Sequence, residues 1–209
     1  MDAAFIQTVL RNLHPRSEWI FLSEVRTCRG FSQQFRPRRS GPGGRAKLLE
    51  QHPAADLDTE RYIDAFALHR WQAQGFHRIA YEIKCSRQDW LNELADPAKR
   101  CFAYYHSHEH WFALAHGIYH DNDIESWADG SGVMLIHEDG SYTLRRPARR
   151  REALHLPEAF LISLLVKALE EPLSTEIAPL PRQNRPVTAL SPGRSPFIDG
   201  GLFPPNADE

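Results

Sequence analysis

Three charged side chains near the middle of the chain have types and spacing that suit phosphodiester chemistry. Asp64 lies in a short apolar segment, and Glu82 and Lys84 flank Ile83 in the next one. In an extended strand Glu82 and Lys84 point to the same face, about 6.6 Å apart along the chain. If the two segments pair as neighbouring strands, Asp64 can face both of them. Two carboxylates and an ammonium group would then converge on one point.

Such a group of side chains suits metal-dependent hydrolysis. Carboxylates bind Mg²⁺ or Mn²⁺, hard cations that prefer oxygen ligands. The ion neutralises charge that develops on the phosphate and lowers the pKa of a bound water. The lysine can position or deprotonate that water, or stabilise the transition state. The backbone carbonyl of Ile83 could supply one more oxygen ligand.

The same residues also fit a purely structural role. A Glu-x-Lys triplet occurs about once by chance in a chain of this length, and an ion pair on an exposed strand is common. The context favours a site, because residues 78–85 alternate cleanly between apolar and polar side chains. In addition, Ser86 and Asp89 form a helix-capping pattern directly after the strand.

The hydrophobic pattern predicts an α/β protein with a mixed central sheet flanked by helices. Helices are expected near 3–13 and 87–105, and strands at 18–28, 62–68, 78–85 and 111–115. Residues 133–136 and 142–144 flank a Glu-Asp-Gly-Ser turn and predict a hairpin. Pro157 opens a last helix, whose expected core face is Phe160, Leu161, Leu164, Leu165, Ala168 and Leu169.

The 209 residues divide by composition into a domain and a tail. Residues 1–171 are expected to form one domain, interrupted at 30–55 by a mobile, basic, glycine-containing loop. Eight of the fifteen prolines lie in residues 172–209, where apolar periodicity stops. A flexible, proline-rich tail is therefore expected there.

Composition also limits the compartment and the partners. No apolar run approaches the roughly 20 residues that span a bilayer, and no signal-peptide core fits the charged first residues, so we expect a cytoplasmic protein without membrane contact. Three cysteines without metal-type spacing agree with a reducing compartment. The net charge of −2 means that a nucleic-acid partner would need a local basic patch.

Two arginine-rich segments could form such a patch. One lies in the 30–55 loop and the other follows the predicted hairpin. Both suit phosphate contacts, which hold nucleic acid without reading its sequence, and both also suit a solvated surface. Their arginines are Arg36, Arg38, Arg39 and Arg45 in the loop, and Arg145, Arg146, Arg149, Arg150 and Arg151 after the hairpin.

A histidine array offers a competing, non-enzymatic hypothesis. His106, His108 and His110 would share one face of a strand and could bind zinc or nickel. However, the array falls where a helix turns into a strand, and a turn does not hold three imidazoles in register. Surface histidines are therefore the expectation.

The segments Tyr62–Ala65 and Tyr81–Trp90 resemble the PD-(D/E)XK nuclease superfamily, most of all the MmcB family of proposed DNA-repair endonucleases. In that family an Asp-Val or Asp-Ala strand precedes a Val-Glu-Ile-Lys strand and a Ser-Arg-x-Asp-Phe helix start. His110–Leu114 and Ser131–Ile136 resemble two later strands of the family. The resemblance covers about residues 60–150, and the inserted loop at 30–55 departs from the family pattern.

The resemblance implies a restriction-endonuclease-like αβββαβ core, followed by a C-terminal hairpin and helix. It implies that Asp64 and Glu82 bind the metal and that Lys84 is the catalytic lysine. Many members add an upstream acidic residue, for which Glu24 is the candidate and Glu18 the alternative. DNA is the implied substrate, in repair or genome defence, and a homodimer is possible. A catalytically inactive nuclease fold that binds DNA or protein stays open as the alternative.

Overall fold

The computed structural model describes residues 1–27, 61–95, 100–124 and 130–170. The predicted basic loop at 30–55, with Arg36, Arg38, Arg39 and Arg45, lies outside the described residues. So does the predicted tail at 172–209.

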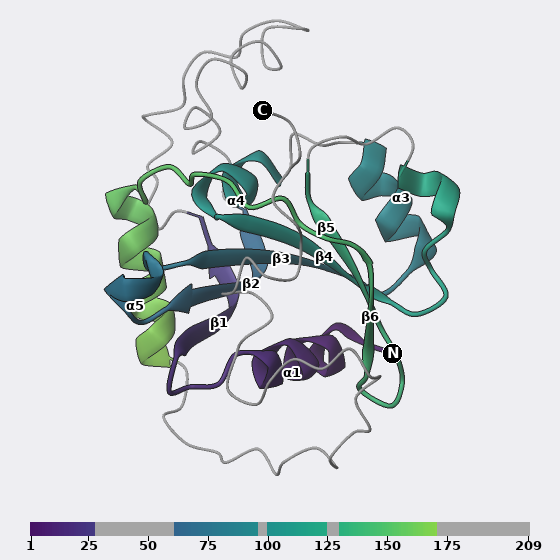
Figure 1. The fold of residues 1–209 in the computed structure, drawn as a ribbon, viewed down its shortest axis with the longest axis horizontal. Coiled ribbons are helices and arrows are strands. Elements are labelled where there is room, and N and C mark those ends of the chain that lie inside the picture. The colour runs from purple at the N-terminus through teal and green to yellow at the C-terminus, as the bar shows by residue number, and fades with distance from the viewer. Residues whose placement is uncertain (28–60, 96–99, 125–129, 171–209) are drawn as a thin grey trace, which may run out of the picture.

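A six-stranded sheet forms the centre of the molecule (Figure 1), and its spatial order follows the order of the chain. β1, β2 and β3 are antiparallel neighbours, β4 and β5 run parallel to β3, and β6 returns antiparallel to β5. The prediction of an α/β protein with a mixed sheet is confirmed. The strands are β1 (Trp19–Arg26), β2 (Tyr62–His69), β3 (Arg78–Lys84), β4 (Glu109–Ala115), β5 (Gly132–Ile136) and β6 (Tyr142–Arg146).

Helices cover both faces of this sheet. On one face lies α1 (Ala3–Leu13), whose apolar stripe packs against side chains from β1 to β5. On the other face lie α3 (Arg87–Ala95), α4 (Cys101–His106) and α5 (Glu158–Glu170). Two short 3-10 turns, Gln72–Gln74 and Asp121–Ile124, follow β2 and β4. Within the described residues, no helix is long and apolar enough to cross a membrane.

Strand alternation explains how one sheet supports two cores. On β4, Trp111 and Ala113 face α1, whereas Phe112 and Leu114 pack with Trp90 of α3. All seven residues of β4 are buried, as expected for a central strand that is covered on both faces. The site described below therefore forms on the face that carries α3 and α4.

The predicted core face of the last helix is only partly correct. Phe160 and Leu164 are buried, but Leu161, Leu165 and Leu169 are 43%, 66% and 87% exposed. The helix packs against β1, the strand at the edge of the sheet. An edge strand covers a narrower stripe of a helix than the middle of a sheet does, so most of the apolar surface of α5 stays exposed.

The sheet loses its regularity near Asp64, on β1 and β2. Glu24 has a φ of 51°, a left-handed conformation that is unusual for a residue with a side chain. Leu22 and Val25, three residues apart, consequently belong to the same core cluster, which strict alternation would prevent. This irregularity lies where β1 passes Asp64 on β2.

Candidate active site

Asp64 and Glu82 meet where the ladder between β2 and β3 ends. The last paired positions are Ala65 and Tyr81, so Asp64 and Glu82 are the next residues on each strand. There the Asp64 side chain acts as the hydrogen-bond acceptor in place of a backbone carbonyl. Its Oδ2 accepts a hydrogen bond of 2.7 Å from the backbone N–H of Ile83. This bond turns the carboxylate toward β3 and places it beside Glu82.

Lys84 completes the group that the spacing predicted. Its Nζ lies 3.2 Å from Oε2 of Glu82, two residues earlier on the same strand. The side chains of Lys84 and Glu82 are only 15% and 12% exposed. The structure therefore brings two carboxyl groups and one ammonium group together in a largely desolvated position.

Glu93 on α3 is a fourth member of this cluster, and the sequence analysis missed it. Its Oε2 lies 3.3 Å from Nζ of Lys84, and its Oε1 lies 3.7 Å from the guanidinium of Arg100. Arg100 also donates to the Glu93 backbone carbonyl at 3.2 Å. One sequence signal was present: Glu93 follows Trp90 by three residues, so a helix places it on the same buried face.

The two carboxyl groups perturb each other's protonation. Burial, and next the negative charge of Asp64, raise the pKa of Glu82 to about 8. Burial also raises the pKa of Asp64, although the Ile83 N–H and the Lys84 ammonium oppose that shift. Glu82 therefore holds its proton at neutral pH, next to the Asp64 carboxyl group.

Lys84 remains charged in this environment. Burial by itself disfavours the ammonium form, but the carboxyl groups of Glu82, Glu93 and Asp64 outweigh it and raise the pKa of Lys84. A lysine of this kind is a poor proton acceptor at neutral pH. Its role in chemistry would be to orient groups and stabilise negative charge.

Asp64 and Glu82 suit a hard divalent cation by donor chemistry. They are buried carboxyl groups that repel each other when both are ionised, and a cation between them would remove that repulsion. Across the four described ranges, no three His, Cys, Asp or Glu side chains are arranged as a ready ligand set. A bound ion would therefore take its remaining ligands from backbone, water or substrate oxygens, as Mg²⁺ commonly does.

The two upstream acidic candidates lie at opposite ends of β1. Glu24 lies across from Asp64, between the Ser23–Ala65 and Val25–Ile63 pairs, and its side chain is exposed. Its participation stays a prediction, favoured by its left-handed backbone, since such residues are frequent at functional sites. Glu18 bonds through its carbonyl to Arg70, six residues beyond Asp64 and about 20 Å away, so it is out of reach.

The arginines that follow the hairpin do not form one surface. Arg145 pairs with Asp121 at 2.7 Å, and Arg146 is half-buried. Arg151 is held against α4, with its guanidinium carbon 3.5 Å from the centre of the Tyr104 ring and a 2.8 Å bond to the Tyr104 carbonyl. The exposed pair that could grip phosphates is Arg149 and Arg150.

These two arginines also lie away from the acidic cluster, which comprises Asp64, Glu82, Glu93 and the paired Lys84. The backbone N–H of Arg149 bonds to Gly130, just before β5, and that of Arg151 bonds to His108, just before β4. Asp64, Glu82 and Lys84 lie instead at the end of β3 that leads into α3. Phosphate contact by Arg149 and Arg150 would therefore be made near the starts of β4 and β5, at the opposite end of the parallel strands from Glu82 and Lys84.

The histidine array is part of the core and does not form a metal centre. As predicted, a helix ends and a strand begins here, because α4 stops at His106 and β4 starts at Glu109. The expectation of surface histidines is wrong, since His106 and His110 are buried. The three rings have separate partners, because His106 bonds to the Phe102 carbonyl, His108 to the Arg78 N–H and His110 to Ser131.

Electrostatics agree with a structural role for the array. Burial, followed by the positive charge of Arg78, lowers the pKa of His108 to about 4. Burial also lowers the pKa of His106. Both rings are therefore neutral at physiological pH and act as fixed hydrogen-bonding groups. Neutral imidazoles can bind a metal, so it is the separate hydrogen-bond partners of the three rings, and not their protonation, that remove the geometric basis for a His-rich metal-binding module.

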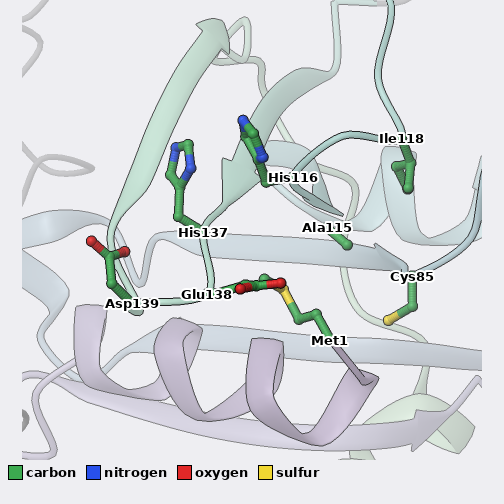
Figure 2. Close-up of a pocket in the computed structure, with 8 residues that line it drawn as sticks. All are labelled: Met1, Cys85, Ala115, His116, Ile118, His137, Glu138 and Asp139. Carbon is green, nitrogen blue, oxygen red and sulfur yellow. The ribbon is translucent and has the colours of Figure 1, made fainter.

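A cavity of about 440 Å³ lies on the other face of the sheet, near the ends of β3, β4 and β5 (Figure 2). Cys85, which directly follows Lys84, lines it from the α1 side. His116 and His137 project into it from the ends of β4 and β5, with ring centres 4.5 Å apart. The sheet therefore separates this cavity from Asp64, Glu82 and Lys84.

A comparison of the chain with known protein families, with curated proteins and with solved structures finds no match. Any function must therefore be inferred from the residues of the site and their geometry.

We predict that Glu82→Gln stabilises the protein, most strongly near pH 8. Between about pH 4.5 and pH 8 the native Glu82 holds a proton that its unfolded counterpart has released. The free energy of unfolding therefore falls as the pH rises through this window, and glutamine removes that dependence. Thermal melts in metal-free buffer should show a Tm at least about 3 °C above wild type at pH 8.

At pH 4 the Tm difference between Glu82→Gln and wild type should shrink to near zero, because Glu82 is then protonated in both states. The exposed Glu152→Gln change is the matched control and should leave the Tm unchanged at either pH. A Glu82→Gln variant that melts below wild type at pH 8 would contradict the raised pKa.

Proposed function

We propose that this protein is a metal-dependent nuclease of the PD-(D/E)XK type that hydrolyses phosphodiester bonds in DNA. The observation that carries the proposal is the hydrogen bond from Ile83 to Asp64, which brings a second carboxyl group beside the Glu82–Lys84 pair. Paired carboxylates and an adjacent ammonium group are what this hydrolysis requires.

The arrangement of the elements supports the same proposal. A helix, three antiparallel strands, two helices and a parallel strand follow one another along the chain, which agrees with the αβββαβ order that the motif resemblance implies except for one additional helix. The β5–β6 hairpin and α5 come after it. Asp64, Glu82 and Lys84 lie on β2 and β3 of this arrangement, at the positions that the resemblance assigns to chemistry.

Each residue then has a distinct task. Asp64 and Glu82 would hold Mg²⁺ or Mn²⁺, with the Ile83 carbonyl as a further candidate ligand. The ion, when bound, supplies charge neutralisation at the phosphate and a bound water of lowered pKa. Glu82 must first release its proton, so metal binding should strengthen as the pH rises toward 8. Lys84 stays charged and stabilises negative charge on the phosphate oxygens.

A catalytically inactive module that binds DNA or protein is the second candidate. One observation favours it: Lys84 contacts both Glu82 and Glu93, while Asp64 is hydrogen-bonded to Ile83, so most of these groups already pair with one another. Such a closed set of contacts is also what a retained but unused site would have. The cleavage assay below separates the two candidates.

The proposal extends to the biological role of the nuclease and to its assembly as a homodimer. The proposed role lies in DNA repair or genome defence in the cytoplasm. Cutting both strands of a duplex needs two sites, which a homodimer would provide through two-fold symmetry.

We predict cleavage of plasmid, linear or branched DNA with Mg²⁺ or Mn²⁺, abolished by a chelator. Asp64→Asn and Glu82→Gln should lose metal binding in calorimetric titrations, because an amide lacks the charge that holds a hard cation. Lys84→Ala should keep metal binding while its cleavage rate falls by a factor on the order of 10².

Because Glu82→Gln should be more stable than wild type, its loss of activity would not reflect unfolding. If wild-type protein cuts none of these substrates with either metal, the nuclease proposal fails and the binding module replaces it. Full activity of Lys84→Ala would also exclude the assigned chemistry.

Arg149 and Arg150 give a separate prediction about DNA binding. Replacing both by alanine should weaken binding equally for different sequences and lower the salt dependence of log K by about 2, one unit for each lost phosphate contact. Binding is measured with the Asp64→Asn protein over a range of salt concentrations, so that no DNA is cut. Unchanged affinity and slope would show that these arginines are solvated surface.

A further inference from the structure

Glu93 is an unusual residue for the interior of a small helix. Its side chain is 6% exposed, and its carboxylate faces Lys84 on one side and Arg100 on the other. A buried carboxylate costs several kcal/mol unless it is well paired. Among the described residues, the cation nearest to its carboxylate is Lys84, at 3.3 Å. Its charge therefore acts mainly on that lysine.

We propose that Glu93 is a positioning residue that holds the ammonium group of Lys84 over the Asp64–Glu82 pair. The inference rests on the proposed nuclease function and deepens it. Lys84 has a flexible four-carbon side chain, whose charged end has no fixed direction without a partner. Glu93 supplies that partner from a different element, α3, so that the end of Lys84 is fixed relative to the sheet.

A second partner for Lys84 is necessary because Glu82 has another task. In the described structure Glu82 and Glu93 share the ammonium group, at 3.2 and 3.3 Å. If Glu82 binds a metal ion, its charge is drawn to that ion and its hold on Lys84 weakens. Glu93 then keeps the ammonium group in place next to a second cation that repels it.

Position and charge argue that Glu93 serves the lysine and does not bind the metal. The Lys84 ammonium lies within ion-pair distance of both Glu82 and Glu93. A metal ion bound to both glutamates would have to occupy the space next to that ammonium group, where like charges repel. A site made by Asp64 and Glu82 leaves Glu93 paired with the ammonium group, and that pairing offsets the repulsion between Lys84 and the ion.

Arg100 is the second cation that contacts Glu93, on the side away from Lys84. It is 2% exposed, donates to the Glu93 carbonyl at 3.2 Å, and lies over the Phe112 ring with its guanidinium carbon 5.5 Å from the centre. These contacts join α3, the start of α4 and β4. The guanidinium charge lies 3.7 Å from Oε1 of Glu93 and favours the orientation in which Oε2 contacts Lys84.

The test compares Glu93→Gln with Glu93→Asp and with a matched control, Glu109→Gln. Glu109 is similarly buried and hydrogen-bonded, to His77 at 3.0 Å, but it faces the α1 side of the sheet. Both glutamine variants remove one buried charge and should lower the Tm. Only Glu93→Gln should change the properties of Lys84.

Three measurements follow each variant. Glu93→Gln should lower the single-turnover cleavage rate by about 10- to 100-fold, the effect of misplacing a catalytic group. The Kd for Mn²⁺ and the KM for DNA should stay within about twofold of wild type. The ¹⁵N-edited NMR signal of the Lys84 ammonium, identified by its loss in Lys84→Ala, should be sharp in wild type and broadened in Glu93→Gln. Glu93→Asp should recover part of the cleavage rate and part of the sharpness of the Lys84 signal. Glu109→Gln should keep the wild-type cleavage rate and a sharp Lys84 signal.

The possible contrary results have different meanings. A tenfold or greater loss of Mn²⁺ affinity in Glu93→Gln would make Glu93 a metal ligand and overturn the proposal. So would a rate and an NMR signal that match those of Glu109→Gln. In a Lys84→Ala background Glu93→Gln should cost no further activity, and an additional loss would again overturn it. If wild type proves inactive on DNA, the proposed function fails, while the NMR comparison still decides whether Glu93 fixes Lys84.

Discussion

The hydrogen bond from the Ile83 N–H to Asp64 is the contact on which the candidate site depends. At this point a backbone carbonyl of β2 would ordinarily accept that bond. Since the Asp64 side chain accepts it, the carboxylate is fixed toward β3 and lies next to Glu82. Two buried carboxyl groups then need a cation, which Lys84 provides, and Lys84 in turn contacts Glu93, which faces Arg100. One irregularity in a β-ladder thus leads to a chain of charged groups through two strands, α3 and the start of α4.

Burying Glu82 beside Asp64 lowers the free energy of unfolding at neutral pH. Burying Glu82 beside Asp64 raises the pKa of Glu82 to about 8, which means that the native state resists the ionised form that metal binding requires. Proteins commonly accept such a cost at functional sites, and a purely structural cluster would gain stability by replacing one carboxylate with an amide. The strained backbone at Glu24, across from Asp64, fits the same pattern.

The functional candidates lie on different faces of the sheet and at different ends of its strands. The acidic cluster lies at the end of β3 on the face that carries α3, and the cavity with His116 and His137 lies on the α1 side. Arg149 and Arg150 lie near the starts of β4 and β5, on the segment that leads to α5, at the opposite end of these strands. Grip on a phosphate backbone and hydrolysis would therefore depend on separate parts of the molecule, so each can be altered without the other.

Much of the architecture was determined by local sequence. Alternation over residues 78–85, the caps at Ser86 and Pro157 and the Glu-Asp-Gly-Ser turn depend on neighbouring residues alone, and the strands and helices they predict are present. The same alternation put Glu82 and Lys84 on one face. Tertiary structure decided what local patterns cannot encode. Whether Asp64 reaches β3 depends on the register of two strands that are separate in sequence, and Glu93 joins the cluster because α3 packs across the end of β3. His106 and His110 are buried, and Leu165 and Leu169 are exposed, because burial depends on which elements pack against a segment and not on the segment's own residues.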